Sequence, residues 1–266
     1  MQAGFICPDG KRVSHRQCLE GCRQRCLTLP TLASLAQVRE WNGIPSTTQC
    51  LNGTRMEYLK ITSDYYVKPK ERAFALLGTR HHFRLEAITR KLNVLSEEKL
   101  QGEVSGVIDL LEPDHAPDCY ILADYKTSGS YKVARALRGD MSDWELQLNN
   151  YRIMVEDLGF PVSRMLVQCT VRDGGTFMAR KNGLTENIYL IPVKRLDDAQ
   201  VKDYFYRKSQ MLIKAVENGE MPPPCNGEES WGGRRCLGYC DVVDLCPGFP
   251  GAQASATSLP RRKRRR

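Results

Sequence analysis

The stretch that decides the fold runs Gly102-Glu-Val-Ser-Gly-Val-Ile-Asp109-Leu-Leu and, after a polar bridge, Cys119-Tyr-Ile-Leu-Ala-Asp124-Tyr-Lys126-Thr. Both segments are apolar and rich in β-branched residues, and the bridge contains Pro and Asp, which predicts the two strands of a hairpin. Side chains alternate between the faces of a strand, so Asp124 and Lys126 share one face. The pairing therefore predicts that Asp109, Asp124 and Lys126 meet at neighbouring strand ends.

Two carboxylates and one ammonium group suit one kind of chemistry. Carboxylates are the usual protein ligands of Mg²⁺ and Mn²⁺. A lysine beside the ion can orient or deprotonate water, or neutralise charge on a phosphate. The set favours metal-assisted hydrolysis of a phosphodiester. The structural alternative is a cross-strand Asp–Lys ion pair on a solvated face, and this stretch alone does not separate the two interpretations.

Length, composition and charge are those of a globular protein. At 266 residues the chain can bury a full core. No apolar run reaches the ~18–20 residues needed to cross a membrane, and no signal segment opens the chain. We expect a cytoplasmic protein without membrane contact, in the host cytoplasm if it is phage-encoded. The net charge of +8 falls to +2 without the six basic residues at 261–266, so basicity belongs to the tail.

Periodicity predicts an α/β fold in which helices flank a mixed central sheet. Ser46 and Gln49 form a capping box at the start of one of these helices. Helices are predicted over 31–41, from 46 to about 63, and over 70–97, 143–158 and 198–217, strands over 164–172 and 187–193, and a short helix or loop over 131–138.

Two of the predicted helices carry candidate site residues. His81 falls on the apolar stripe of 70–97 and reads as a core histidine, whereas His82 lies ~100° around the helix. His82 is therefore the better candidate for a metal ligand. Gln147 and Tyr151 are four residues apart, so they lie on the same side of their helix. They either pack together or reach a phosphate or the attacking water.

Eleven cysteines are many for an intracellular chain, and eight of them gather at its two ends. In a reducing compartment such clusters are more often metal ligands than disulfides. The N-terminal set is Cys7, Cys18, Cys22 and Cys26, and the C-terminal set is Cys225, Cys236, Cys240 and Cys246. The first set predicts a zinc site, with small buried hydrophobes as the alternative. The second set ends in Cys-Pro, which is typical of iron–sulfur ligation, though zinc would use the same thiolates.

These features divide the chain into four predicted segments. A Cys-rich zinc-binding segment covers 1–29, a catalytic core covers 30–220, a Cys-rich metal staple covers 221–250, and a disordered basic tail covers 251–266.

Four motifs in order resemble the RecB-like branch of the PD-(D/E)xK nucleases. They are Gly78-Thr-Arg-His-His82, Gly106-Val-Ile-Asp109, Asp124-Tyr-Lys126 and Gln147-Leu-Asn-Asn-Tyr151, and the resemblance covers roughly residues 44–247. The terminal cysteines are similar to the iron–sulfur staple of the CRISPR-adaptation and AddB-type exonucleases of this branch, which has phage-encoded relatives. The resemblance implies that His82, Asp109 and Asp124 hold the catalytic metal. It also implies that Lys126 is the catalytic lysine and that Gln147 and Tyr151 support substrate or water.

The cysteine pattern departs from that family in two ways. The family staple takes one upstream cysteine and three C-terminal ones, with two residues between the first pair of the three. Here three residues separate Cys236 from Cys240, and Cys225 adds a fourth local thiol, while Cys50 stands where the upstream ligand would be. The fourth ligand is therefore Cys50 or Cys225, and the metal is iron–sulfur or zinc. The N-terminal cysteines have no counterpart in the family core.

We therefore expect a Mg²⁺- or Mn²⁺-dependent deoxyribonuclease acting on linear DNA ends in recombination, repair or phage DNA processing, with protein partners that the sequence does not specify. One alternative is a non-catalytic nucleic-acid-binding or recombination-partner module on the same fold. Another is a sequence- or structure-specific endonuclease, which the lack of an evident recognition domain disfavours.

Overall fold

The computed structural model describes residues 1–249 apart from 90, 93 and 116. Contacts within the chain divide it into two compact units, which we describe separately. Unit 1 comprises Met1–Gly43, Asn52–Arg72 and the chain from Met211 onward, and unit 2 comprises Ile44–Leu51 and Ala73–Gln210. The four segments predicted from the sequence stay a prediction, and the basic tail lies outside the described residues.

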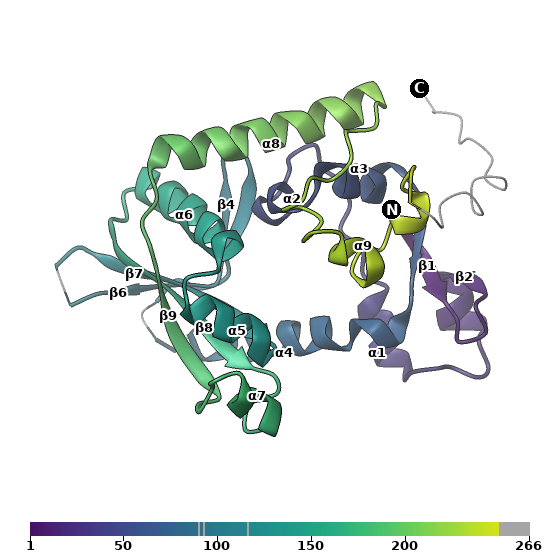
Figure 1. Cartoon of the computed structure of the whole chain (residues 1–266), viewed down its shortest axis with the longest axis horizontal. Coiled ribbons are helices and arrows are strands. Elements are labelled where there is room, and N and C mark those ends of the chain that lie inside the picture. The colour runs from purple at the N-terminus through teal and green to yellow at the C-terminus, as the bar shows by residue number, and fades with distance from the viewer. Residues whose placement is uncertain (90, 93, 116, 250–266) are drawn as a thin grey trace. The chain divides into compact units, whose positions relative to one another are not determined.

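Unit 2 is built on a four-stranded mixed sheet, as the sequence predicts (Figure 1). Its strands, in spatial order, are β6 (Leu110–Pro113), β7 (Tyr120–Ser128), β8 (Val162–Val171) and β9 (Ile188–Val193). The central pair β7 and β8 is parallel, and the two outer pairs are antiparallel. The α/β fold class is confirmed.

The first half of the predicted hairpin is two strands rather than one. β5 (Ser105–Ile108) pairs with β4 (Glu98–Gln101), while β6 pairs with β7 in the other sheet. The chain bends at Asp109, between β5 and β6, so Asp109 belongs to neither strand. The hairpin of β6 and β7 is confirmed, but the continuous strand predicted across Asp109 is wrong.

The helices of unit 2 cover the sheet. Their bounds are α2 (Thr47–Leu51), α4 (Ala73–Thr89), α5 (Ser130–Leu137), α6 (Ser142–Asp157), α7 (Phe177–Lys181) and α8 (Asp198–Asn218), which continues into unit 1. α6 lies along one face of the sheet (Figure 1), where Leu148 and Val155 are buried in one core with Leu122 of β7 and Val167 of β8. This core fixes α6 relative to the strand that carries Asp124 and Lys126.

Polar contacts inside unit 2 fix the ends of its helices. The predicted capping box forms, since the Ser46 amide donates to Gln49 Oε1 at 2.8 Å and the Gln49 amide donates to Ser46 Oγ at 3.3 Å. On α6, the Nδ2 of Asn149 donates to the carbonyls of Glu145 and Lys194, and its Oδ1 accepts from the Leu196 amide. The asparagine side chain thus ties α6 to the segment after β9.

Three predicted helices are shorter than their sequence pattern. The helix predicted over 70–97 ends at Thr89, because Leu95 then exchanges two backbone hydrogen bonds with Leu111 of β6 and the chain turns into β4. The helix predicted from 46 to 63 breaks at Asn52-Gly53 into α2 and α3 (Thr54–Thr62). The helix predicted over 31–41 is α1 (Leu29–Leu35).

Unit 1 gathers the two ends of the chain around short elements. A three-stranded sheet in the order β2-β1-β3 comprises β1 (Gln2–Ile6), β2 (Arg12–Ser14) and β3 (Tyr65–Val67). Its other elements are α1, α3, the π-helix η1 (Gln17–Gly21), the 3₁₀ helices η2 (Pro69–Arg72) and η3 (Val243–Leu245), and α9 (Arg234–Gly238). Two small apolar cores result, one containing Phe5 and Leu32 and the other containing Met56 and Leu212. The N-terminal cysteine segment therefore shares a core with α1 and β3.

Within the described part of the chain, every helix is too short or too polar to cross a membrane.

Candidate metal centre

The candidate site lies where β6 ends and β7 continues. The last paired residues at this end of the hairpin are Leu110 and Ala123. Continuing that register by one residue sets Asp109 beside Asp124. The bend at Asp109 turns its side chain toward the open edge of β7, where Oδ2 accepts a hydrogen bond of 2.7 Å from the Tyr125 amide. Repulsion from Asp109 adds to the rise in the pKa of Asp124, so the two carboxylates are electrostatic neighbours.

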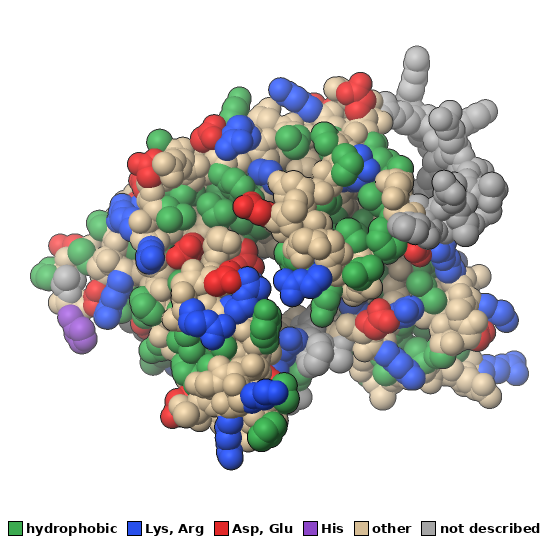
Figure 2. Space-filling model, in the orientation of Figure 1, with side chains coloured by type: hydrophobic (Ala, Val, Ile, Leu, Met, Phe, Trp, Pro, Cys, Tyr) green, Lys and Arg blue, Asp and Glu red, His purple; other side chains and the backbone are tan. Residues whose placement is uncertain are grey.

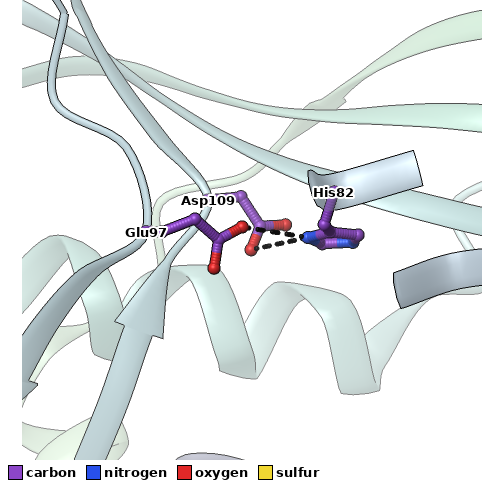
Figure 3. Close-up of side chains that lie close together, drawn as sticks. All are labelled: His82, Glu97 and Asp109. Atoms are coloured by element: carbon purple, nitrogen blue, oxygen red, sulfur yellow. Dashed lines mark hydrogen bonds and ion pairs between the residues drawn. The ribbon is translucent and has the colours of Figure 1, made fainter. Parts of the chain in front are cut away.

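A cluster of metal-ligand groups lies at the same edge (Figure 3). The carboxylates of Glu97 and Asp109 point toward the imidazole of His82, with Nδ1 at 3.3 Å from Glu97 Oε1 and 3.4 Å from Asp109 Oδ1. One ligand atom from each residue lies within 4.8 Å of the others. No other trio of His, Cys, Asp or Glu among the described residues meets that condition.

His82 is oriented by a second contact. Its Nε2 lies 3.1 Å from the backbone oxygen of Tyr125, an acceptor only, so Nε2 carries a proton and donates. In the neutral ring this tautomer leaves the lone pair on Nδ1, the atom that faces the two carboxylates. A backbone carbonyl that fixes the tautomer of a histidine in this way is a common feature of metal sites.

The carboxylates control the charge of His82. Hydrogen bonding to Asp109 is the largest cause that raises the pKa of His82 to about 9, and Glu97 adds to it against the opposing effect of burial. Burial, followed by repulsion from Asp109, raises the pKa of Glu97. With raised pKa values, His82 and Glu97 hold a proton more tightly than usual. A divalent cation would displace such protons, because metal ligands bind in their deprotonated forms.

Lys126 links Asp124 of the same strand to α6. Lys126 Nζ lies 2.6 Å from Asp124 Oδ2 and donates to Gln147 Oε1 at 3.0 Å. Gln147 Nε2 in turn donates to the Tyr151 hydroxyl at 3.4 Å. The predicted catalytic residues Asp124, Lys126, Gln147 and Tyr151 therefore form one connected chain of polar contacts.

Burial and the opposite charge of the partner shift the pKa values of Asp124 and Lys126 in opposite directions. The side chain of Asp124 is 4% exposed, and burial is the main cause that raises its pKa to about 6. Burial alone would lower the pKa of Lys126, but the carboxylate of Asp124 outweighs it and raises that pKa. Lys126 therefore keeps its proton at neutral pH. Although Asp124 Oδ2 contacts the ammonium group, it accepts no hydrogen bond of good geometry from the described residues.

The glycines of two motifs differ in how closely other side chains pack against them. A methyl group on Gly106 would overlap the ring of Tyr151, so this glycine lets the tyrosine lie flat against β5. A methyl on Gly78 of α4 would lie 3.5 Å from Thr127 Oγ1, which is an ordinary contact. Gly106 is therefore required by close packing, whereas Gly78 is not.

Tyr125 and His81 are the aromatic neighbours of His82. Tyr125 turns away from Asp124 and Lys126 and is buried with Leu110 and Ala123. His81 packs edge-on against the Tyr125 ring, with 6.0 Å between ring centroids. Burial lowers the pKa of His81, as expected of a packed histidine rather than a charged one.

Glu97 is the site residue that the sequence interpretation missed. The predicted helix over 70–97 placed Glu97 in its last turn, whereas the chain leaves the helix at Thr89 and returns along β6. Glu97 takes a left-handed backbone conformation, with φ of 54°, which turns it out of the strand path just before β4. The available signal was the Asn93-Val-Leu-Ser96 run, whose polar ends favour a turn over a helix.

The C-terminal cysteines lie in unit 1 around the start of α3. The Met56 amide donates to Cys225 Sγ, the Val242 amide donates to Cys240 Sγ, and Arg55 Nη1 donates to Cys246 Sγ at 3.9 Å. Burial raises the pKa of Cys225, and repulsion from Cys246 and Cys236 adds to the rise, so these thiols are electrostatic neighbours.

Cys50 and Cys225 have different surroundings. Cys50 is buried in the core of unit 2 with Val104 and Phe205. Cys225 lies against Gly53, where a methyl group would collide with its sulfur.

The N-terminal cysteines follow β1 or lie in and after η1. Cys7 follows β1, Cys18 lies in η1, and Cys22 and Cys26 follow η1. Cys18 is buried and Cys26 is partly buried in the core that contains Phe5 and Leu32. In the described part of the chain, all eleven cysteines are free thiols rather than disulfides.

On the face shown by Figure 2, lysine and arginine side chains are interspersed with acidic and apolar side chains.

Comparison with known proteins gives a distant structural likeness. No protein-family model matches this chain, and no curated protein matches it. Among solved structures, the crystal structure of SSO0001 matches with a TM-score of 0.49 at 18% identity, over 82% of this chain and 92% of that one. The "Putative exonuclease" of Eubacterium rectale matches with a TM-score of 0.32 at 14% identity, over 69% of this chain. This chain spans 65% of that protein's length, which is less than two thirds. At these scores neither likeness carries an argument about function.

Proposed function

We propose that this chain is a metal-dependent nuclease that hydrolyses phosphodiester bonds of DNA, and that it acts as an exonuclease on linear ends. The observation that carries the proposal is the position of Asp109. Its Oδ1 faces His82, its Oδ2 accepts from Tyr125, and by register it adjoins Asp124. Asp109 thus joins a cluster of metal-ligand groups to a strand that presents a carboxylate and an ammonium group.

The donor set fits a hard divalent cation. Mg²⁺ and Mn²⁺ are hard cations that prefer the oxygen ligands that Glu97 and Asp109 offer, and the imidazole of His82 would add one nitrogen ligand. The buried Asp124 Oδ2, which accepts no well-formed hydrogen bond from the described residues, has capacity for a cation as well. His82, Glu97, Asp109 and Asp124 would hold the ion, which when bound would activate water and polarise the phosphate.

The remaining residues supply charge and position. Because Lys126 is protonated, it would donate a hydrogen bond to a phosphate oxygen on which negative charge develops, rather than act as a base. Its ammonium contacts two acceptors among the described residues, Asp124 and Gln147, which leaves one N–H for the substrate. Tyr151 and Gln147 would hold that ammonium in place, as positioning residues behind it.

The finer parts of the proposal rest on the resemblance to RecB-like nucleases. It supplies DNA as the substrate and the ends of linear DNA as the point of attack. The non-catalytic module and the endonuclease are retained as outcomes of the test.

For the C-terminal cysteines we propose a structural metal, either an iron–sulfur cluster or Zn²⁺, with Cys225 as the fourth ligand beside Cys236, Cys240 and Cys246. Backbone and arginine donors aimed at three of these sulfurs suit thiolates. Without metal, burial holds the Cys225 and Cys240 thiols protonated by raising their pKa values. Metal binding would replace those protons.

The test is digestion of end-labelled linear DNA and of covalently closed circular DNA with Mg²⁺ or Mn²⁺. We expect digestion of the linear form only, with a loss of at least about 100-fold in rate for Asp124→Ala, Asp109→Ala and Lys126→Ala. Asp203→Ala is the matched control, because the one ion pair of this exposed carboxylate among the described residues is with Arg207 along α8. Cleavage of circular DNA would favour the endonuclease, and DNA binding without cleavage by metal-loaded protein would favour the binding module.

A further inference from the structure

We propose that Cys7, Cys18, Cys22 and Cys26 form a second, tetrathiolate zinc site, which fixes the β1–β2 hairpin to η1 and the chain that follows it. The argument concerns only residues of unit 1, and it does not depend on the proposed nuclease function.

The first ligand is set at a tight turn. Cys7 ends β1, its amide donates to the Lys11 carbonyl at 2.8 Å, and its carbonyl accepts from Gly10 at 2.9 Å. Gly10 has a φ of 84°, which the turn requires and which glycine adopts without strain. A cysteine at the corner of such a hairpin presents its thiol at the end of two paired strands, where its backbone is fixed.

The other three thiols come from one short helix and its exit. Cys18 lies in the π-helix η1, and Cys22 is the extended residue that ends it. η1 packs against β2 and α1. Cys18 and Cys26 lie in the same core as Phe5 of β1 and Val13 of β2, so the helix and the hairpin that supply the thiols share one core.

The thiols also affect one another electrostatically. Burial is the largest cause that raises the pKa of Cys18, and Cys22, Cys26 and Cys7 all add to the rise. Cys26 and Cys22 likewise raise the pKa of Cys7. Among the described residues, no three of these sulfurs lie within 4.8 Å of one another, so a metal ion would have to draw the set together.

The ring of His15 is engaged in other contacts, so we leave it out of the proposed site. Its ring packs edge-on against Phe5, with centroids 4.8 Å apart, and its Nε2 lies 3.2 Å from Gln2 Nε2. The site is therefore four thiolates without imidazole. Four thiolates with no open position are the donor set of structural zinc rather than of a catalytic ion.

The experiment is differential alkylation of the wild-type chain with iodoacetamide, read by peptide mass mapping before and after zinc is removed with a chelator and then restored. We expect about one bound zinc ion to protect all four thiols, Cys7, Cys18, Cys22 and Cys26, from alkylation. After the chelator removes the zinc, all four thiols should react together. Cys119 is the control thiol, since it lies on the turn between β6 and β7 and should react equally in all three states.

A second measurement separates this site from the C-terminal cysteines. The zinc content of Cys22→Ser chain should fall by one equivalent, whereas iron or zinc bound at the C-terminal set should be unchanged. If Cys7 and Cys22 of the wild-type chain were alkylated equally with and without zinc, the proposal would be overturned, whatever the result for the variant. Protection by iron but not by zinc would overturn it as well.

Discussion

The ring of Tyr151 on α6 lies directly against Gly106 of β5, so closely that a Cβ atom at position 106 would overlap it. The tyrosine hydroxyl accepts from Gln147, and Gln147 accepts from Lys126. A glycine in one sheet therefore sets the position of an ammonium group on another strand.

This packing makes Gly106→Ala a sharp test. We expect the substitution to displace Tyr151, to destabilise the fold by about 1–3 kcal/mol, and to reduce DNA digestion. Denaturant unfolding and the digestion assay measure the two effects. Gly102→Ala is the control, because its Cβ would meet nothing closer than the Met154 methyl group at 3.8 Å. Equal stability of the two variants would mean that the Tyr151 ring is not held as described.

Glu97 should matter for metal binding although no motif contains it. Replacing its carboxylate in Glu97→Gln keeps the size of the side chain and removes the charge beside His82. We expect the affinity for Mn²⁺ to fall at least about tenfold, as measured by calorimetric titration. Glu98→Gln changes the next, exposed residue and should bind Mn²⁺ as the wild type does. Unchanged affinity of Glu97→Gln would remove Glu97 from the metal centre.

His82 should titrate at unusually high pH in the metal-free protein. Hydrogen bonding to Asp109 raises the pKa of His82 from 6.5 to about 9. A pKa raised by folding means that the charged ring stabilises the fold below pH 6.5, and that this contribution is lost as the pH rises through about 9. Nuclear magnetic resonance of the imidazole gives the pKa directly, and Asp109→Asn should return it toward 6.5. A wild-type pKa near 6.5 would contradict the hydrogen bond.

The identity of the fourth C-terminal ligand can be decided by metal content. We expect Cys225→Ser to lose the metal bound by Cys236, Cys240 and Cys246, because Cys225 lies among them. Cys50→Ala should keep that metal, since Cys50 packs in the apolar core of unit 2. Metal analysis and visible absorption of the two variants measure the outcome. The reverse pattern would assign the ligand to Cys50.

Local patterns in the sequence predict much of this fold because they report local physics. Strand alternation places Asp124 and Lys126 on one face and Tyr125 on the other, as the structure has them. Helical spacing predicts the Gln147–Tyr151 contact, and the capping box at Ser46 forms with both of its bonds. Each of these depends on residues at most four apart in the chain.

Contacts between residues far apart in the sequence could not be predicted in the same way. The bend at Asp109 arises because β5 and β6 pair with different strands, and a single apolar run does not distinguish two partners from one. Glu97 reaches His82 only because the chain leaves α4 at Thr89 and returns along β6. The periodic pattern of 70–97 continues past that exit and conceals it.

The pairing of Leu110 with Ala123 sets the strand register on which the relative position of the two carboxylates depends. A slip of one residue between β6 and β7 would turn one carboxylate to the opposite face of the sheet. A slip of two would restore the face but separate the groups by about 7 Å along the strand. Transplanting the two carboxylates into another protein would require transplanting this strand register with them.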